Sequence, residues 1–186
     1  MIRYGVTLLM LLFCCNPVAS QCSGKNYLSS ILESSGDQRQ KAISELYSKG
    51  KESIPVLMEC IDNSEAVEMG LDNPFSSNVF PNSPVYKGLI AAYLIELILG
   101  CSEIKLMPFS EPSNSLICGG PMSYPYENGR IFDTVKRRPI VVRDLAIIKN
   151  IYKKWWFNNE TKSLDELRTE WGQGQRPLTK SRYTWK

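Results

Sequence analysis

Apolar residues recur at helical spacing through most of the chain, which predicts a mainly α protein. Residues 26–35 and 37–48 each carry apolar side chains three or four positions apart, as on one face of a helix. Gly50 stands where the end of a helix favours a left-handed residue. Ser53-Ile54-Pro55 then opens a third helix, because proline is tolerated in a first helical turn.

The helices on either side of Gly50 look like a HEAT-type helical hairpin, and no second copy follows at a fixed period. Residues 85–100 are apolar almost all round, which predicts a central buried helix. Glu96 lies inside this stretch. A buried carboxyl has a raised pKa and can act as an acid or base. We favour a structural alternative, in which Glu96 is one polar edge of the helix or pairs with a lysine or arginine.

The C-terminal third predicts two more helices and a tail. Asp144 caps the first helix, which carries an inward stripe that includes Tyr152 and Trp155. The second begins with the capping box Ser163-Leu164-Asp165-Glu166 and ends at Gly172. Helical spacing favours core positions for Trp155 and Trp171. Residues 173–186 are then an extended tail, in which Trp185 either docks on the core or meets a partner.

Between the helices lie two stretches without clear periodicity. Residues 63–87 predict a long loop rich in proline and asparagine. Residues 101–143 are the least regular part of the chain. Within them, residues 130–133 and 140–142 can pair as a small β-hairpin around Lys136-Arg137-Arg138. The basic stretch 135–143 suits an acidic partner, anionic peptidoglycan or lipid headgroups, although a solvated hairpin tip is the simpler interpretation.

The first 22 residues have the pattern of an export signal. Arg3 precedes an apolar run over residues 6–15, and Val18-Ala19-Ser20 offers the small residues of a cleavage site. The run is shorter than the roughly 20 apolar residues that span a bilayer. The sequence therefore predicts a signal peptide at residues 1–20 and one domain at residues 21–186. The mature protein would carry no transmembrane segment and would work outside the cytosol, most simply in the periplasm of a Gram-negative bacterium.

Export changes how the cysteines are interpreted. Cys22, Cys60, Cys101 and Cys118 remain after cleavage, and an oxidising compartment favours two disulfides among three possible pairings. We favour Cys101–Cys118, because a loop-rich segment joins them, and then Cys22–Cys60. Lipidation of Cys22 is the alternative, and Gln21 argues against it because a small residue normally precedes an acylated cysteine.

Charge and composition narrow the function. The formal net charge is only +3, too little for a nucleic-acid binder. The chain has no histidine, which excludes Ser-His-Asp and Cys-His catalysis and any histidine-bearing zinc site. No motif indicates a cofactor, a metal site or a catalytic residue. We therefore expect a binding protein rather than an enzyme, and a hydrolase that uses carboxylates stays open as a minor alternative.

Candidate partner-binding residues come from loops and the tail. Residues 119–126 combine turn residues with two tyrosines and a methionine, and such a loop can enter a partner's cleft. The candidates in this loop, before the hairpin and in the tail are Met122, Tyr124, Tyr126, Arg130, Arg182, Tyr183 and Trp185.

The C-terminal third resembles a pattern of exported bacterial helical proteins of uncharacterised role. The shared motifs are Tyr-x-x-Trp-Trp at residues 152–156, Ser-Leu-Asp-Glu-Leu-Arg at 163–168 and Arg-Pro-Leu-Thr-Lys-Ser-Arg-Tyr-Thr-Trp at 176–185. In size, export and helical content the chain is also similar to periplasmic immunity proteins against type VI secretion effectors. That resemblance implies a partner, a cognate secreted toxin such as a peptidoglycan hydrolase, which this protein would bind and inhibit. A non-catalytic envelope module that recognises glycan or protein is the alternative.

Overall fold

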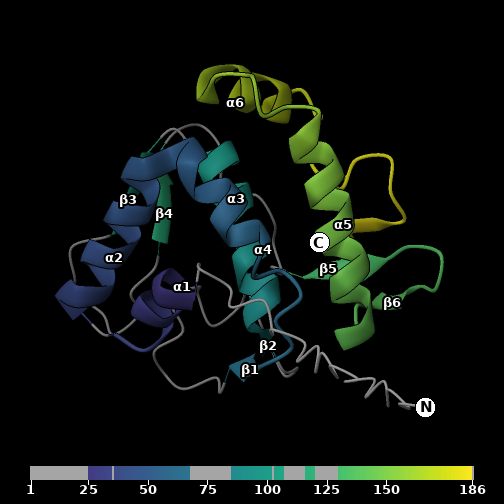
Figure 1. Ribbon diagram of the computed structural model, residues 1–186, viewed down its shortest axis with the longest axis horizontal. Helices are drawn as coiled ribbons and strands as arrows, with labels where there is room; N and C mark the ends of the chain where they lie inside the picture. The colour runs from purple at the N-terminus through teal and green to yellow at the C-terminus, as the bar shows by residue number, and fades with distance from the viewer. Residues whose placement is uncertain are drawn as a thin grey trace, which may run out of the picture.

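The computed structural model describes residues 25–34, 36–67, 85–101, 103–106, 116–119 and 130–185. These residues form a mainly α fold with small antiparallel sheets, as predicted (Figure 1). The expected signal peptide at residues 1–20 and the loop candidates Met122, Tyr124 and Tyr126 lie outside the described residues. Within the described ranges, no helix has both the length and the apolar character needed to cross a membrane.

The N-terminal helices form where the apolar spacing predicts them. They are α1 (Lys25–Leu32), α2 (Gly36–Lys49) and α3 (Ser53–Met58), with a short 3-10 turn at Gly50–Glu52 before α3. Gly50 has φ +51°, which confirms the predicted left-handed position. The chain reverses there, so that α3 runs back from the end of α2 (Figure 1). The predicted helical hairpin is present, with a shorter second helix.

The central helix is α4 (Lys87–Gly100), and every residue from Gly88 to Leu99 is buried. Its first turn lies against the chain that follows α3, because the Gly88 N–H donates to the Asn63 carbonyl at 2.9 Å. A Cβ on Gly88 would lie 2.1 Å from the carbonyl oxygen of Ile61, so only glycine allows this approach. The short strands β1 (Ala66–Val67) and β2 (Val85–Tyr86) pair beside this contact.

Cys60 and Cys101 are both fully buried and disulfide-bonded. Cys60 lies near the first turn of α4, whereas Cys101 directly follows its last turn, about 20 Å away at 1.5 Å per residue. Half-cystines have Cα atoms less than about 7 Å apart, so these two are not joined to each other. Two of the three possible pairings therefore remain. One is the favoured pairing, and in the other Cys60 pairs with Cys118 and Cys101 with Cys22. Cys22–Cys60 with Cys101–Cys118 stays a prediction, since the other two side chains lie outside the description.

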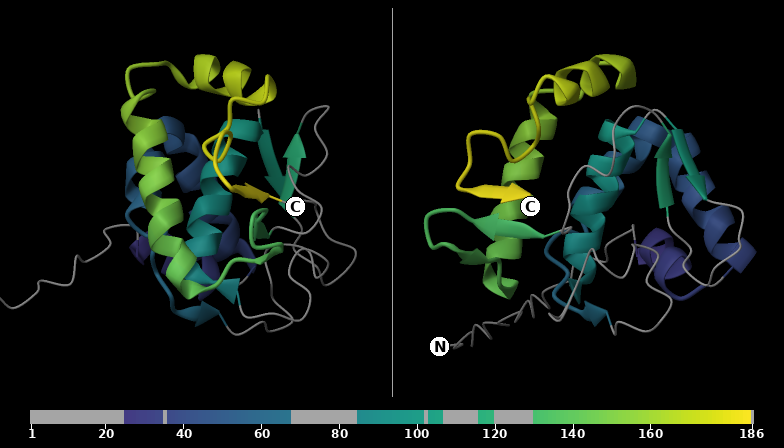
Figure 2. Two further views of the ribbon diagram at one scale, coloured as in Figure 1. Left: turned by 90° about the vertical axis from the view of Figure 1, so that its right-hand side faces the viewer. Right: turned by 180° about the vertical axis from the view of Figure 1, so that it is seen from behind.

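The C-terminal helices are α5 (Val142–Phe157) and α6 (Leu164–Gly172). The capping box of α6 is confirmed, since the Ser163 hydroxyl accepts from the Glu166 N–H and the Ser163 N–H donates to Glu166 Oε2. Helix α5 begins three residues earlier than predicted. Asp144 is therefore not the residue before the helix; it lies in the first turn and accepts the Val141 N–H at 2.9 Å. Figure 2 shows α6 crossing one end of the molecule, beside the end of α4.

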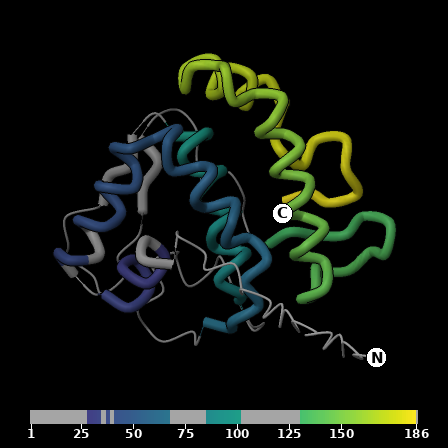
Figure 3. The backbone as a smooth tube through the Cα atoms, viewed as in Figure 1, coloured from purple at the N-terminus to yellow at the C-terminus, as the bar shows by residue number. Residues whose placement is uncertain are grey.

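Five further strands complete the described fold. The hairpin β3 (Glu103–Leu106) and β4 (Leu116–Gly119) was not predicted. The predicted second hairpin is present as β5 (Ile131–Asp133) and β6 (Arg138–Pro139), with its second strand two residues nearer the turn. The strand β7 (Tyr183–Trp185) pairs with the other side of β5, which gives a sheet of order β6-β5-β7. The backbone trace in Figure 3 shows that the C-terminal segment returns from α6 and ends beside the middle of α5.

Candidate functional site

A buried hydrogen-bonded chain joins the C-terminal elements to the central helix. Glu96 has no exposed surface, and its two carboxylate oxygens accept separately from the Tyr152 hydroxyl and the Trp171 indole N–H, each at 2.6 Å. The Tyr152 hydroxyl in turn accepts from the Trp185 indole N–H at 3.2 Å. Glu96 therefore ties α4 to α5, α6 and β7. It lies at no polar edge, because it has no exposed surface, and its two oxygens accept from a tyrosine and a tryptophan rather than from the expected lysine or arginine.

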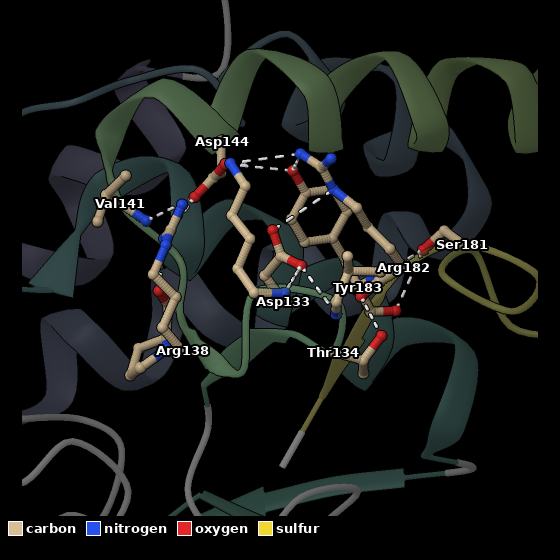
Figure 4. A network of polar contacts seen from close by, with 11 residues as sticks. Asp133, Thr134, Arg138, Val141, Asp144, Ser181, Arg182 and Tyr183 are labelled. Atoms are coloured by element: carbon tan, nitrogen blue, oxygen red, sulfur yellow. Dashed lines mark hydrogen bonds and ion pairs between the residues drawn. The ribbon is translucent and has the colours of Figure 1, made fainter.

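A second polar network holds the β5–β6 hairpin on the first turn of α5 (Figure 4). Asp144, with 1% of its surface exposed, accepts from Arg138 Nη1 and the Val141 N–H, both at 2.9 Å, and from the Tyr183 hydroxyl at 3.2 Å. Arg182 lies 3.4 Å from Asp133 and 4.0 Å from Asp144, and it donates to the Tyr183 hydroxyl at 2.6 Å. Each strand of the sheet thus contributes a side chain to the network.

The network sets the ionisation of its members. Burial opposes ionisation of Asp144, but the Val141 N–H and the Arg138 guanidinium outweigh it and hold the pKa of Asp144 below its usual value. Burial raises the pKa of Tyr183, with the Arg182 hydrogen bond acting in the opposite direction. The network therefore keeps Asp144 as an anion and Tyr183 as a neutral donor at neutral pH.

Asp144→Asn should lower the free energy of unfolding by about 2 kcal/mol at pH 7, because a charge-assisted hydrogen bond is lost. A carboxyl with a depressed folded pKa stabilises above its unfolded pKa, and this contribution is lost as pH falls through the folded pKa. The difference between the two proteins should therefore be constant above about pH 4 and shrink below it. Urea unfolding between pH 2.5 and 7 measures this, with exposed Glu45→Gln as the control. A difference that stays unchanged at pH 2.5 would contradict the assignment.

The same network holds the hairpin tip, residues 134–137, in one shape. Asp133 Oδ1 accepts from the N–H groups of Val135 and Lys136, and the Thr134 hydroxyl donates to the Arg182 carbonyl at 2.8 Å. Arg137 adopts φ +52°, an unusual conformation for a residue with a side chain. Val135 is 72% exposed between the exposed Lys136 and the end of β5. The hairpin tip is therefore a protruding turn that is held by hydrogen bonds, with the apolar Val135 beside Lys136 and Arg137.

A groove lies at the other end of α5. Its volume is about 750 Å³, and it is bounded by the last turns of α5, by α6 at Glu170 and by the segment 175–181. The lining mixes aromatic, amide, hydroxyl and cationic side chains. It includes Trp155, Asn158, Gln175, Arg176 and Lys180, and also Lys154.

The segment 173–182, which we call the groove loop, is held by its own hydrogen bonds. The Thr179 hydroxyl donates to the Gly174 carbonyl at 2.7 Å and accepts from the Arg176 N–H at 3.0 Å. Leu178, 5% exposed, anchors the loop in the core. Lys180 adopts φ +68° at the rim of the groove. The wall of the groove is therefore formed before any ligand arrives.

The structure divides the described contact candidates into buried and partly exposed residues, and it also places the two tryptophans that were predicted as core. Tyr183 and Trp185 are 2% and 7% exposed, so they belong to the core and are not surface contacts. Arg182 is partly exposed and engaged in the polar network, and Arg130 is half-buried just before β5. Trp171 is buried as predicted, whereas Trp155 is only half-buried and lines the groove. No pattern in the sequence indicates the groove directly, because the groove loop lacks any periodicity.

Comparison with protein-family models, with curated proteins and with solved structures gave no match. Across the described ranges, no group of three or more histidine, cysteine, aspartate or glutamate side chains is placed to hold a metal ion. The hairpin tip and the groove are therefore the two features of the described structure that bear on function.

Proposed function

We propose that this protein is a periplasmic immunity protein that binds and inhibits a secreted antibacterial toxin, in the first instance a cell-wall-degrading effector. The hairpin tip is the observation that supports this proposal most directly. It projects beyond α5 (Figure 1) and presents Val135, which is followed directly by the exposed Lys136 and Arg137. An apolar residue next to two cations suits an acidic cleft, because it combines burial of apolar surface with charge complementarity.

The bracing of the tip matters for inhibition. A recognition loop that is already ordered loses little conformational entropy when it binds, so more of the contact energy appears as affinity. The two N–H bonds to Asp133 and the side-chain bond from Thr134 order this tip in the free protein. Such a tip can enter the active-site cleft of a hydrolase and exclude its substrate.

Co-expression with the product of the neighbouring gene tests the proposal. We expect the two proteins to co-purify and the immunity protein to rescue cells from toxicity. Val135→Asp and Arg137→Glu should each weaken the complex at least tenfold without unfolding the protein, because both side chains are exposed. Lys41→Glu, an exposed charge reversal on α2, is the matched control and should leave binding unchanged.

Two results would contradict the proposal. One is the absence of both co-purification and rescue. The other is a complex that forms but is equally tight with Val135→Asp, Arg137→Glu and Lys41→Glu, which would move the contact away from the hairpin tip. Met122, Tyr124 and Tyr126 stay predicted contacts, and their alanine variants extend the same assay.

An envelope module that recognises glycan is the second candidate, and the groove favours it. Trp185 is buried and cannot stack on a ligand, but Trp155 offers a half-buried ring at the groove wall. Retention on peptidoglycan sacculi that is lost in Trp155→Ala would support this candidate. If the protein were retained on sacculi but rescued cells from no toxin, the glycan-binding module would be favoured over the immunity protein.

A further inference from the structure

We propose that the groove between α5 and the groove loop binds an oligosaccharide that carries carboxylate groups. This site is separate from the hairpin tip, so the proposal does not depend on the immunity function. Its volume of about 750 Å³ lies in the range of small-ligand sites, which is roughly 300 to 1,000 Å³. The lining residues come from α5, α6 and the groove loop, so the site is complete within one chain.

The charges around the groove favour an anion. Lys154 on α5 and Lys180 on the groove loop are both exposed, and within the described part of the chain neither makes an ion pair. Glu170 contributes the opposite charge, but Lys162 Nζ donates to both of its oxygens, at 2.6 and 2.7 Å. The groove therefore has two ammonium groups on different walls and a carboxylate that is already neutralised.

The uncharged side chains favour a sugar over a peptide or a bare phosphate. Trp155 contributes an aromatic surface. A tryptophan ring has an apolar face, and its N–H edge can remain in contact with water. The exposed amides of Asn158 and Gln175 each offer donors and an acceptor, which match the paired roles of sugar hydroxyls. A pyranose ring presents C–H faces and a hydroxyl edge, so it uses both kinds of group. Free phosphate would contact neither the Trp155 ring nor the amide oxygens of Asn158 and Gln175.

The conformation of Lys180 supports a ligand role for its ammonium group. Its φ of +68° is one that glycine adopts without cost, whereas a side chain there stores backbone strain. The hydrogen bonds of Thr179 and Ser181 on either side hold this conformation in place. A lysine held in a strained position at the rim of a groove is placed to bind rather than to stabilise the fold.

Isothermal titration with three probes tests the site on the mature protein. The probes are digalacturonate, the neutral disaccharide N,N′-diacetylchitobiose and tetraglutamate. We expect digalacturonate to bind at least tenfold more tightly than the other two. Lys154→Gln, Lys180→Gly and Trp155→Ala should each weaken digalacturonate binding at least fivefold, and Lys41→Gln should leave it unchanged.

Lys180→Gly keeps the test valid if Trp155→Ala folds poorly. Glycine relieves the strained φ, so this variant should keep or raise the melting temperature while it loses binding. Equal binding of the neutral disaccharide would overturn the anionic assignment. Tetraglutamate binding that matches digalacturonate and ignores Trp155 would overturn the saccharide assignment, and no binding of any probe would overturn both. Val135→Asp should leave digalacturonate binding intact, so a failure of the groove and a failure of the hairpin tip are distinguishable.

Discussion

Glu96→Ala is expected to lower the free energy of unfolding by about 3 to 5 kcal/mol. The substitution leaves the Tyr152 hydroxyl and the Trp171 indole N–H without an acceptor in a fully buried site. An unsatisfied buried donor costs about 1 to 3 kcal/mol, and the shorter side chain also leaves a cavity in the central helix. Urea denaturation followed by circular dichroism measures the change.

Glu96→Gln is the matched variant. A glutamine oxygen can still accept from one donor, and its amide can donate to the Tyr152 oxygen, so we expect a loss of only about 1 to 2 kcal/mol. If Glu96→Ala cost no more than Glu96→Gln, the buried hydrogen bonds would not be the reason for a glutamate at this position. Glu45→Ala, an exposed change on α2, should be near neutral and controls for the loss of a negative charge.

Trp185→Ala is expected to cost a similar amount, about 3 to 5 kcal/mol. Trp185 is 7% exposed, its ring meets Tyr93 edge-on at 5.8 Å, and its N–H donates to the Tyr152 hydroxyl. The substitution removes all three contributions and loosens β7 from β5. Hydrogen exchange at the amides of β5, together with urea denaturation, measures both effects.

Trp185→Phe separates packing from hydrogen bonding. It retains an aromatic ring beside Tyr93 but has no donor for Tyr152, so we expect a loss of about 1 kcal/mol. Lys154→Ala, exposed on the neighbouring helix, is the surface control and should stay within about 0.5 kcal/mol. Loss of less than 1 kcal/mol in Trp185→Ala would show that β7 contributes little to the fold.

The helices were predictable because each one satisfies a local rule. Apolar spacing identified α2, α4 and α5, the capping box identified the start of α6, and Gly50 identified the turn before α3. Helix starts were less certain. Asp144 was predicted to precede α5, but a carboxylate in the first turn can bond back to the preceding N–H and serves the same purpose.

The missed elements depend on contacts between distant residues. Strand β7 has only three residues, and its partner β5 lies about 50 positions earlier, so no local pattern marks it. Trp185 alone does not reveal whether it docks or meets a partner. The answer comes from Tyr93 and Tyr152, on two other helices. Strands β3 and β4 likewise pair across a stretch with no clear alternation.

The groove was not predictable for a related reason. Its far wall is a loop that is held by backbone hydrogen bonds and by one threonine side chain, which bonds to the backbone of Gly174 and Arg176. An extended tail was expected because the sequence there has no period. The individual residues were visible as cations and amides, but their convergence on α5 follows only from the anchoring of Leu178.

The position of β7 has a consequence for the order in which the core can be completed during synthesis. The aromatic contacts that complete the core come from residues that the ribosome makes after every other described element. A chain that is cut before Thr184 would expose an unpaired edge of β5 and the ring of Tyr93, which are features that invite aggregation and proteolysis. The strand β7 is thus the last described element that the core needs, although it is only three residues long.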